Sequence, residues 1–268
     1  MQTKYTVALL MAIMFIAVSW TKKSNAGGHT LKVMTYNTHH CSPPGKSAVI
    51  DVDAIASVIK KENPDIVAVQ EIDVNTKRDG HLNEATEIAS KAGYKSYYFA
   101  KTIDFEGGEY GILILSKYPL SNTVTYKLPT NEAIGGEHRV LATATVQLPN
   151  KEIIQFGCTH LDAYHVENRL LQIKEISRIT AGVKVPFIIA GDFNAEEGSD
   201  VINILDQNFT RTCTHCAPTI HEDGAGDVAI DFIAYKPSGN FIVQSHYVLQ
   251  DIHASDHYPV VSVMKLNF

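Results

Sequence analysis

The sequence predicts an α+β domain in which packed β-sheets are flanked by a few helices. Apolar residues make up 45% of the 268 residues, which is enough for a large buried core and too many for a disordered chain. Short runs rich in Val, Ile, Tyr and Phe recur along the chain and are typical of strands. Few stretches have helical spacing, and they do not alternate strictly with the strands, so packed sheets with helices outside are favoured.

The predicted strands are spread over the whole chain after its first thirty residues. The run that starts at Arg139 alternates with period two, and the turn at Pro149-Asn150 joins it to the next run as a hairpin. The predicted strands span residues 31–37, 66–70, 110–115, 139–147, 152–159, 187–190, 229–235, 241–249 and 258–265.

Four stretches have the spacing of helices. In residues 52–61 the apolar side chains of Ile55, Val58 and Ile59 share one face, and Asn63-Pro64 ends the pattern. Residues 83–92 end at Gly93, residues 166–179 carry apolar side chains at helical spacing, and residues 200–205 form a shorter stretch.

The N-terminus has the pattern of a secretory signal peptide. Lys4 precedes an apolar run over residues 7–18, and small residues follow around Ala26. The run is short for a bilayer span, although an uncleaved anchor is the alternative. Cleavage after Ala26 would leave residues 27–268 as one exported domain, periplasmic or secreted, with no membrane span.

The charge balance is acidic. The net charge is −6, and the first 26 residues contain three lysines and no acid, so the mature chain would carry −9. A chain of this charge has no broad basic field to gather polyanions, which argues against tight, sequence-independent binding of duplex nucleic acid.

Export would place the four cysteines in an oxidising compartment. Cys213 and Cys216 have the spacing of half a zinc site, but no second half is visible, so a local disulfide or two free thiols are the simpler interpretations. A bond between Cys41 and Cys158 is a further hypothesis.

Polar residues end several of the predicted strands, where a rigid strand positions a side chain beside an open loop. Asp231 stands out because a carboxylate flanked by Ile and Phe is costly to bury without a partner such as an imidazole. Each residue alone is a weak signal, since turn residues and helix caps have the same composition. The ordered set is Asn37, Glu71, His160, Asp162, Asp192, Asn194, Asp231, Asp256 and His257.

This ordered set resembles the endonuclease/exonuclease/phosphatase superfamily of deoxyribonuclease-I-like, metal-dependent phosphoesterases. The resemblance extends from Leu31 to the last strand. It implies a four-layer α/β/β/α sandwich of two packed mixed sheets with the active site at one end. The matching motifs are Tyr36-Asn37, Val69-Gln70-Glu71, Thr159-His160-Leu161, Gly191-Asp192-Phe193-Asn194, Ile230-Asp231-Phe232 and Ser255-Asp256-His257.

The resemblance implies a site for Mg²⁺ or Mn²⁺ that serves the attack of water on a phosphate ester. Glu71 is the implied metal ligand, with Asn37 and Asp256 near the same ion, and carboxylates suit such hard cations. Asp192 is similar to the residue that orients or deprotonates the water, and Asn194 would hold water or a phosphate oxygen.

The resemblance implies that His257 and His160 contact the phosphate of the substrate. Asp231 would fix the ring of His257 and favour its charged form. In part of the superfamily the equivalent histidine is described as the general base, so Asp192 and His257 both stay candidates for that role. His160 resembles the second phosphate-contacting histidine.

Three further residues are candidates for substrate binding or support. Arg139 would contact phosphate or brace the site, or would be a surface charge at a strand start. Glu109 would support His160, as an acid does in related deoxyribonucleases. Asp162 would face the site or cap a turn, and His39 and His40 would line its mouth or lie exposed in a loop.

The resemblance does not choose the substrate, because the superfamily cuts nucleic acids, sphingomyelin and phosphoinositides. A nuclease-like phosphodiesterase is the first expectation. A phosphatase or a phospholipase C-type hydrolase is the alternative. A non-catalytic binding protein on this fold is a minor alternative. Such a relative would be expected to lose Glu71, Asp192 or His257, and all three are present. The expected partner is a phosphodiester in a nucleic acid, a lipid or a small molecule, and no partner protein is evident.

Cleavage after Ala26 makes a spectroscopic prediction. Trp20 is the only tryptophan, so the exported protein should show tyrosine but no tryptophan fluorescence. The full-length chain retained inside cells is the control. Tryptophan emission from the exported form would contradict cleavage at this position.

Overall fold

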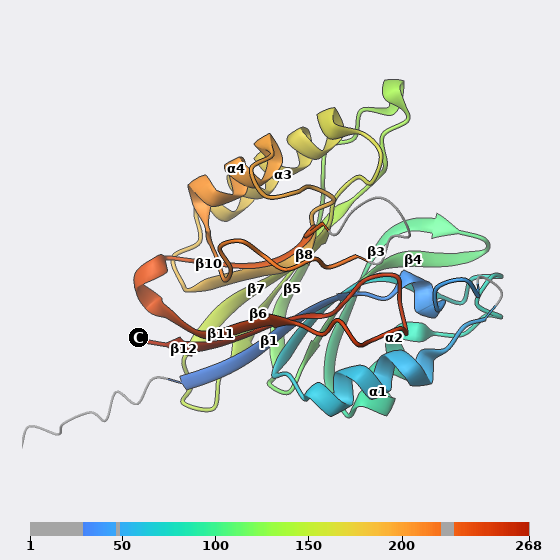
Figure 1. Ribbon diagram of the computed structural model, residues 1–268, viewed down its shortest axis with the longest axis horizontal. Helices are drawn as coiled ribbons and strands as arrows, with labels where there is room; N and C mark the ends of the chain where they lie inside the picture. Colours follow the sequence, from blue (N-terminus) through green and yellow to red (C-terminus); the bar gives the residue numbers. More distant parts are fainter. Residues whose placement is uncertain (1–28, 47–48, 221–227, 268) are drawn as a thin grey trace, which may run out of the picture.

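The computed structural model describes residues 29–46, 49–220 and 228–267. The expected signal peptide, residues 1–26, lies outside them. Two six-stranded sheets pack face to face, with helices on both outer sides, so the chain forms the expected four-layer α/β/β/α sandwich (Figure 1).

The first sheet has a mixed arrangement with the strand order β11-β12-β1-β2-β4-β3. β1 pairs with β2 in parallel, while the other neighbours are antiparallel. Its strands are β1 (His29–Asn37), β2 (Ile66–Val74), β3 (Ser96–Phe105), β4 (Gly108–Ser116), β11 (Phe241–Val248) and β12 (Val260–Leu266).

The second sheet has the order β5-β6-β7-β8-β10-β9. β7 and β8 form its parallel pair, and β6 and β7 form the hairpin expected at Pro149-Asn150. Its strands are β5 (Leu120–Lys127), β6 (Val140–Gln147), β7 (Ile153–His160), β8 (Phe187–Asp192), β9 (Thr210–Arg211) and β10 (Asp231–Lys236).

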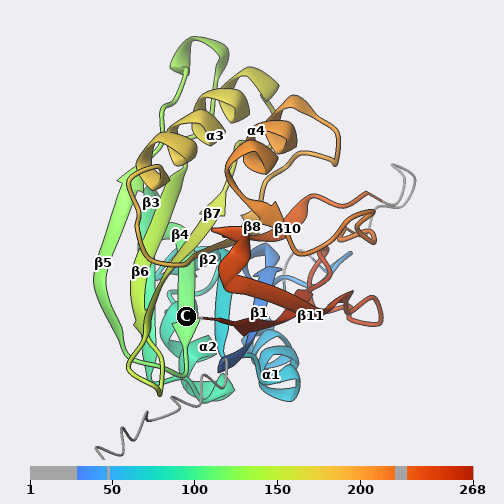
Figure 2. The same ribbon diagram turned by 90° about the vertical axis from the view of Figure 1, so that its left-hand side faces the viewer.

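Four α-helices cover the outer faces in the described part of the chain. α1 (Val52–Glu62) and α2 (Glu84–Ala92) lie on the first sheet, and α3 (Val166–Thr180) and α4 (Asp200–Asn208) lie on the second (Figures 1 and 2). Asp51, Asn83 and Ser199 cap α1, α2 and α4, because each side chain accepts from the backbone amide of the third residue of its helix. Short 3₁₀ turns are η1 (His39–Cys41), η2 (Glu132–Ile134) and η3 (Ser238–Asn240).

None of the helices over the described residues combines the length and the apolar character that a bilayer crossing requires.

Three apolar layers hold the sandwich together. The middle layer joins the two sheets and includes Phe156 and Ile188. The outer layers join α1 and α2 to the first sheet through Ile55 and Ile88, and α3 and α4 to the second through Ile173 and Ile202. The central strands are therefore buried on both faces, which explains their nearly continuous apolar runs.

The strands that sequence patterns did not predict all lie at sheet edges. β3 ends the first sheet, and β5 and β9 end the second. Most residues of β5 are exposed and polar, so this strand lacks the apolar alternation that marks a half-buried strand.

The cysteines confirm one hypothesis and contradict another. Cys213 and Cys216 form the local disulfide. Cys41 and Cys158 are free and buried, so the hypothesis of a bond between them is wrong. Cys41 packs between the first sheet and its helices, whereas Cys158 packs between the two sheets, so the first sheet separates them.

Candidate active site

The strand pairing brings the polar strand ends to one place. In the first sheet Asn37 lies opposite Gln70, next to Glu71. In the second sheet His160 lies beside Asp192 in the parallel pair, and Asp231 lies opposite Asp192 on the other side. Because the carboxyl ends of parallel strands meet at one edge of a sheet, both sheets deliver polar side chains to the same end of the sandwich.

Asn37 joins the two groups across the gap between the sheets. Its Nδ2 donates to Glu71 Oε1 at 3.0 Å and to Asp192 Oδ2 at 3.0 Å. The side chain is buried, and its Oδ1 accepts from the amide of His39 at 3.1 Å. Asn37 therefore holds the two carboxylates on either side of it in a fixed relation.

Glu71 owes its direction to a bulge in β2. The pairing of β2 with β4 is irregular between Val69 and Ile72, and Glu71 has φ of +59°. A left-handed backbone costs a non-glycine residue about 1–2 kcal/mol. The hydroxyl of Thr38 donates to the carbonyls of Gln70 and Glu71 and holds the bulge in place. Bulges re-aim side chains, and this one directs Glu71 toward Asn37.

Asp192 is the point on which the polar groups converge. Its Oδ2, besides accepting from Asn37, lies 3.5 Å from His160 Nε2 and 3.8 Å from His257 Nε2. Its Oδ1 accepts from the amide of Asn194 at 2.8 Å. Burial first, and then the charge of Asp231, raise the pKa of Asp192 to about 7.

Gly191, which precedes this carboxylate, has no room for a side chain. A Cβ atom there would lie 2.1 Å from the carbonyl oxygen of Thr159 on the neighbouring strand. The glycine in the motif therefore permits the close approach of β7 and β8, which places His160 beside Asp192.

His257 is held as a cation by Asp231, as the sequence predicts. Its Nδ1 lies 2.8 Å from Asp231 Oδ2, and both side chains are buried. Burial alone would lower the pKa of His257, but the charge and hydrogen bond of Asp231 more than offset this and raise it to about 10. The ring is thus protonated at neutral pH, and its Nε2–H points toward Asp192.

His160 has the opposite charge state. Burial and then the positive charge of Arg139 lower its pKa well below the usual value, so the ring is neutral. Arg139 Nη1 lies 3.3 Å from His160 Nδ1, and a guanidinium can only donate. Nδ1 is therefore the acceptor, and the proton of the neutral ring is on Nε2, facing Asp192.

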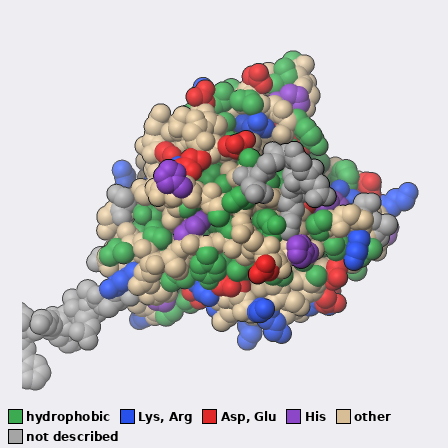
Figure 3. All heavy atoms as spheres, viewed as in Figure 1, with side chains coloured by type: hydrophobic (Ala, Val, Ile, Leu, Met, Phe, Trp, Pro, Cys, Tyr) green, Lys and Arg blue, Asp and Glu red, His purple; other side chains and the backbone are tan. Residues whose placement is uncertain are grey.

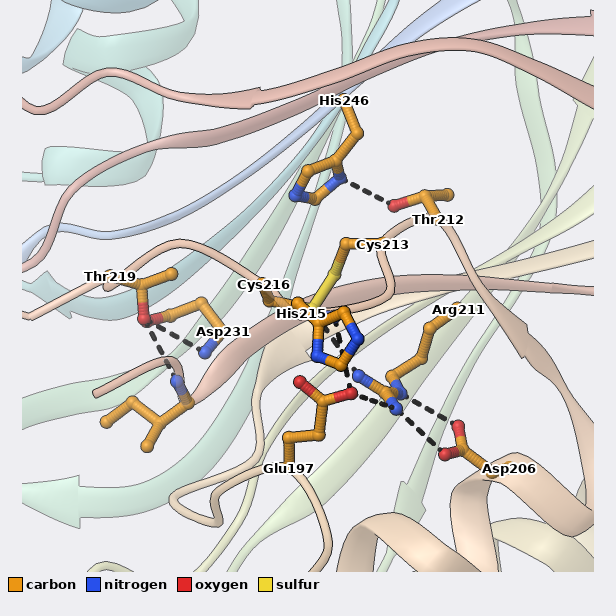
Figure 4. The surroundings of a disulfide bond; sticks show 11 residues. Glu197, Asp206, Arg211, Thr212, Cys213, His215, Cys216, Thr219, Asp231 and His246 are labelled. Atoms are coloured by element: carbon orange, nitrogen blue, oxygen red, sulfur yellow. Dashed lines mark hydrogen bonds and ion pairs between the residues drawn. A yellow bond between two sulfur atoms is a disulfide. The ribbon is translucent and has the colours of Figure 1, made fainter. Parts of the chain in front are cut away.

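Thr219 is a site residue that the sequence patterns did not reveal. Its hydroxyl donates to Asp231 Oδ2 at 2.7 Å and accepts from the amides of Ile230 and Asp231 (Figure 4). Thr219 follows the Cys213–Cys216 disulfide, whose loop is held by the ion pairs of Arg211. No motif marks this threonine, because its role depends on where the loop meets β10.

Glu71 and Asp256 open onto a cavity of about 530 Å³ at this end of the sandwich. His39 and His40 line it as well: a ring nitrogen of His39 lies 3.9 Å from Asp256 Oδ2, and one of His40 lies 3.8 Å from Glu71 Oε2. Burial would raise the pKa of Glu71, but the adjacent ring of His40, the nearby charges of other histidines and the hydrogen bond from Asn37 lower it, so this carboxylate is ionised. Tyr164 is 78% exposed at the rim.

Asn194 lies beside the site, but its side-chain amide group is bound to the backbone of this chain. Its Nδ2 donates to the carbonyl of Leu161 at 3.0 Å, and its backbone has φ of +47°. This residue therefore ties the end of β8 to the segment after β7, and its side-chain oxygen accepts no hydrogen bond from the described residues.

Substrate contact was one alternative for Arg139 and Asp162, and in the structure both side chains brace the chain. The guanidinium of Arg139 is buried and donates to Glu137 at 2.7 Å as well as to His160. Asp162 is fully buried, and its two oxygens accept from the amides of residues 137, 164 and 165 and from Asn168. The turn-capping alternative for Asp162 is therefore the correct one.

Glu109 does not support His160, so that expectation is wrong. Its carboxylate pairs with Lys101 at 3.1 Å on the outer part of β4. The two ring nitrogens of His160 face Arg139 and Asp192. The neighbour of His160 Nδ1 is thus the cation Arg139 and not an acid, so its effect on the pKa of the ring is the reverse of the one expected.

Asp231→Asn should lower the pKa of His257. The amide removes the charge that offsets burial, so the pKa should fall by about 1–3 units from its value near 10. Because a raised histidine pKa means that the cation is favoured, losing the partner shifts the ring toward its neutral form. NMR titration of the imidazole in metal-free protein measures this, with the unsubstituted protein as the reference. A ring that still titrates near 10 in the variant would contradict the pairing.

Comparison with known proteins agrees with this geometry. The family model described as "Endonuclease/Exonuclease/phosphatase family" matches residues 34–257. A search of curated proteins found no match. An endonuclease/exonuclease/phosphatase from Beutenbergia cavernae is 26% identical with a TM-score of 0.74, covering 89% of this chain and 72% of its own.

Two other structures share the fold at lower identity. The mannosyl-6-phosphatase Bt3783 of Bacteroides thetaiotaomicron is 16% identical with a TM-score of 0.67, covering 87% of this chain and 99% of its own. The catalytic domain of human Nocturnin with a bound sulfate anion is 20% identical with a TM-score of 0.69, covering 88% and 93%. The family match extends over most of the chain, and the chain therefore belongs to the endonuclease/exonuclease/phosphatase family.

Proposed function

We propose that this protein is an exported, divalent-metal-dependent phosphoesterase that hydrolyses a phosphodiester by attack of water. The observation that carries the proposal is the hydrogen-bonded chain from Glu71 through Asn37 to Asp192, with His257 and His160 aimed at the same carboxylate. Glu71 lines the cavity, and Asn37 connects it to the buried carboxylate of Asp192, which would act as the base beside the two histidines.

The donors at the cavity fit Mg²⁺ or Mn²⁺. Glu71 is ionised, and Asp256 faces the same cavity; neither forms an ion pair with a lysine or arginine among the described residues. Carboxylate and amide oxygens are the ligands these cations prefer. Glu71 would hold the ion, with Asp256 and Asn37 beside it. A bound divalent ion would neutralise phosphate charge and favour deprotonation of water.

The charge states support distinct roles for the acid and the two imidazoles. A pKa near 7 suits Asp192 to take a proton from water near neutral pH. His257, held protonated by Asp231, is suited to stabilise negative charge on phosphate oxygens and not to act as the base. His160 presents a neutral Nε2–H as a second donor. Asn194 would present its free side-chain oxygen to the water.

The substrate is proposed as a phosphodiester of moderate size. Lys and Arg are interspersed with acids on the face shown in Figure 3, where the described residues form no continuous basic patch. Such a surface does not favour tight binding along a duplex. A phosphatase is the second candidate, because a structural neighbour is a mannosyl-6-phosphatase. A phospholipase C-type hydrolase shares the same chemistry.

Export is part of the proposal. Its support is the signal-peptide pattern over residues 1–26 and the Cys213–Cys216 disulfide, since such bonds persist mainly in oxidising compartments.

Glu71→Gln, Asp192→Asn and His257→Ala should each lower hydrolysis of bis-p-nitrophenyl phosphate by at least about 10²-fold. Each change removes charge stabilisation or proton transfer from the reacting centre. Steady-state rates with Mg²⁺ or Mn²⁺, and with a chelator, measure the effect. Glu109→Gln is the matched control, because this carboxylate lies outside the cavity and pairs with Lys101. Near-wild-type rates in any two of the three folded variants would refute the site.

The substrate class is decided by a panel tested under the same conditions. Plasmid DNA, RNA, sphingomyelin, phosphoinositides and a sugar monophosphate are compared with the model diester. The proposal expects diester cleavage to exceed monoester cleavage in kcat/KM. The reverse order would identify the protein as a phosphatase.

A further inference from the structure

A second group of buried carboxylates lies on the segment that connects β2 to α2, apart from the site described above. Asp73 belongs to β2, Asp79 to the loop, and Glu84 is the first residue of α2. One oxygen from each lies within 4.8 Å of the others. The exposed fractions are 0%, 3% and 0%, so water does not screen these charges.

Only Asp73 has its charge balanced by a neighbour. Arg78 binds it with two nitrogens, at 2.5 Å and 3.0 Å, and the hydroxyl of Thr76 adds a hydrogen bond at 2.9 Å. Neither Asp79 nor Glu84 forms an ion pair within the part of the chain that the structure describes. The cluster therefore has three carboxylates and a single guanidinium, which binds Asp73.

Each unbalanced carboxylate has one oxygen with a partner and one without. Glu84 Oε2 accepts from the amide of Asp73 at 2.8 Å, and Asp79 Oδ1 accepts from the amide of Leu82 at 3.2 Å. Glu84 Oε1 and Asp79 Oδ2 are buried and have no hydrogen-bond partner. The thiol of Cys41 lies beside Glu84, but an S–H group is a weak donor and carries no charge.

Burial of two such carboxylates is costly unless something neutralises them. A single shared proton would satisfy a pair of oxygens and still leave a negative charge. A divalent cation would bind both unpartnered oxygens and balance both charges. Carboxylates, together with backbone carbonyls and hydroxyls of a folded-back loop, are the oxygen ligands that such ions take.

We propose that Asp79 and Glu84, with Asp73 beside them, form a second cation site that takes a hard divalent ion such as Ca²⁺, Mg²⁺ or Mn²⁺. This site is separate from the cavity that holds Glu71 and Asp256, and the inference does not depend on the proposed hydrolysis. The bound ion would have a structural role, because its ligands are buried and leave no open face for a substrate.

The position of the site suggests what the ion stabilises. The same loop carries Arg78, whose guanidinium lies 4.6 Å from the ring centroid of Phe105 and lines the active-site cavity. Asp73 follows the Glu71 bulge by two residues. A cation at this point would hold the end of β2, the loop and the start of α2 together beside the cavity.

The test compares proteins in which the first site is already disabled. Glu71→Gln and the double variant Glu71→Gln/Glu84→Gln are stripped with a chelator and equilibrated with Ca²⁺, Mg²⁺ or Mn²⁺ separately. By elemental analysis, the Glu71→Gln protein should retain one more bound cation per chain than the double variant. At a cation concentration of 100 times Kd, its Tm should rise by roughly 5–10 °C, and the double variant should show neither effect.

Two matched variants in the same background make the result specific. Asp79→Asn removes the other unpartnered oxygen and should abolish the same cation and the same Tm shift. Glu87→Gln on the exposed side of α2 should keep both. Equal cation counts and equal Tm shifts with and without Glu84, for all three cations, would overturn the proposal and assign the cluster a shared proton. Because no readout is activity, a chain that hydrolysed nothing would still decide the question.

Discussion

The carboxylate of Asp192 is bound from both sheets, and the rest of the site is arranged around that contact. Asn37 reaches it from the first sheet, and His160 and His257 reach it from the second sheet and from the segment before β12. A buried carboxylate is tolerated only where donors compensate it, so these groups have to converge. The geometry of the site therefore depends on how the two sheets pack. Asn37 is the residue that connects the sheets at this point.

Two histidines a few ångströms from the same acid have opposite charge states because their outer neighbours differ. Asp231, fixed by Thr219, keeps His257 protonated, whereas Arg139 and burial keep His160 neutral. One ring thus offers a full positive charge and the other a neutral donor. The two rings thus present different hydrogen-bond donors to the same carboxylate.

The family resemblance implied most of the site's residues in advance, namely that Asn37, Glu71, Asp192 and His257 belong to one site. The residues around Asp231 by themselves predicted a partner such as an imidazole. The structure brings these side chains together. The central strands were also predictable, because burial on both faces leaves a continuous apolar run. Edge strands such as β5 were not, because their exposed residues carry no such pattern.

What the sequence by itself determined is the set of reactive side chains and the strands that carry them, since both follow from local composition and order. The tertiary structure alone decided which neighbour each side chain meets. The left-handed turn at Glu71, the guanidinium behind His160, the hydroxyl of Thr219 on Asp231 and the lysine beside Glu109 all depend on register between segments far apart in the chain. A one-residue shift in that register would reverse the facing of every side chain, and local sequence does not encode it.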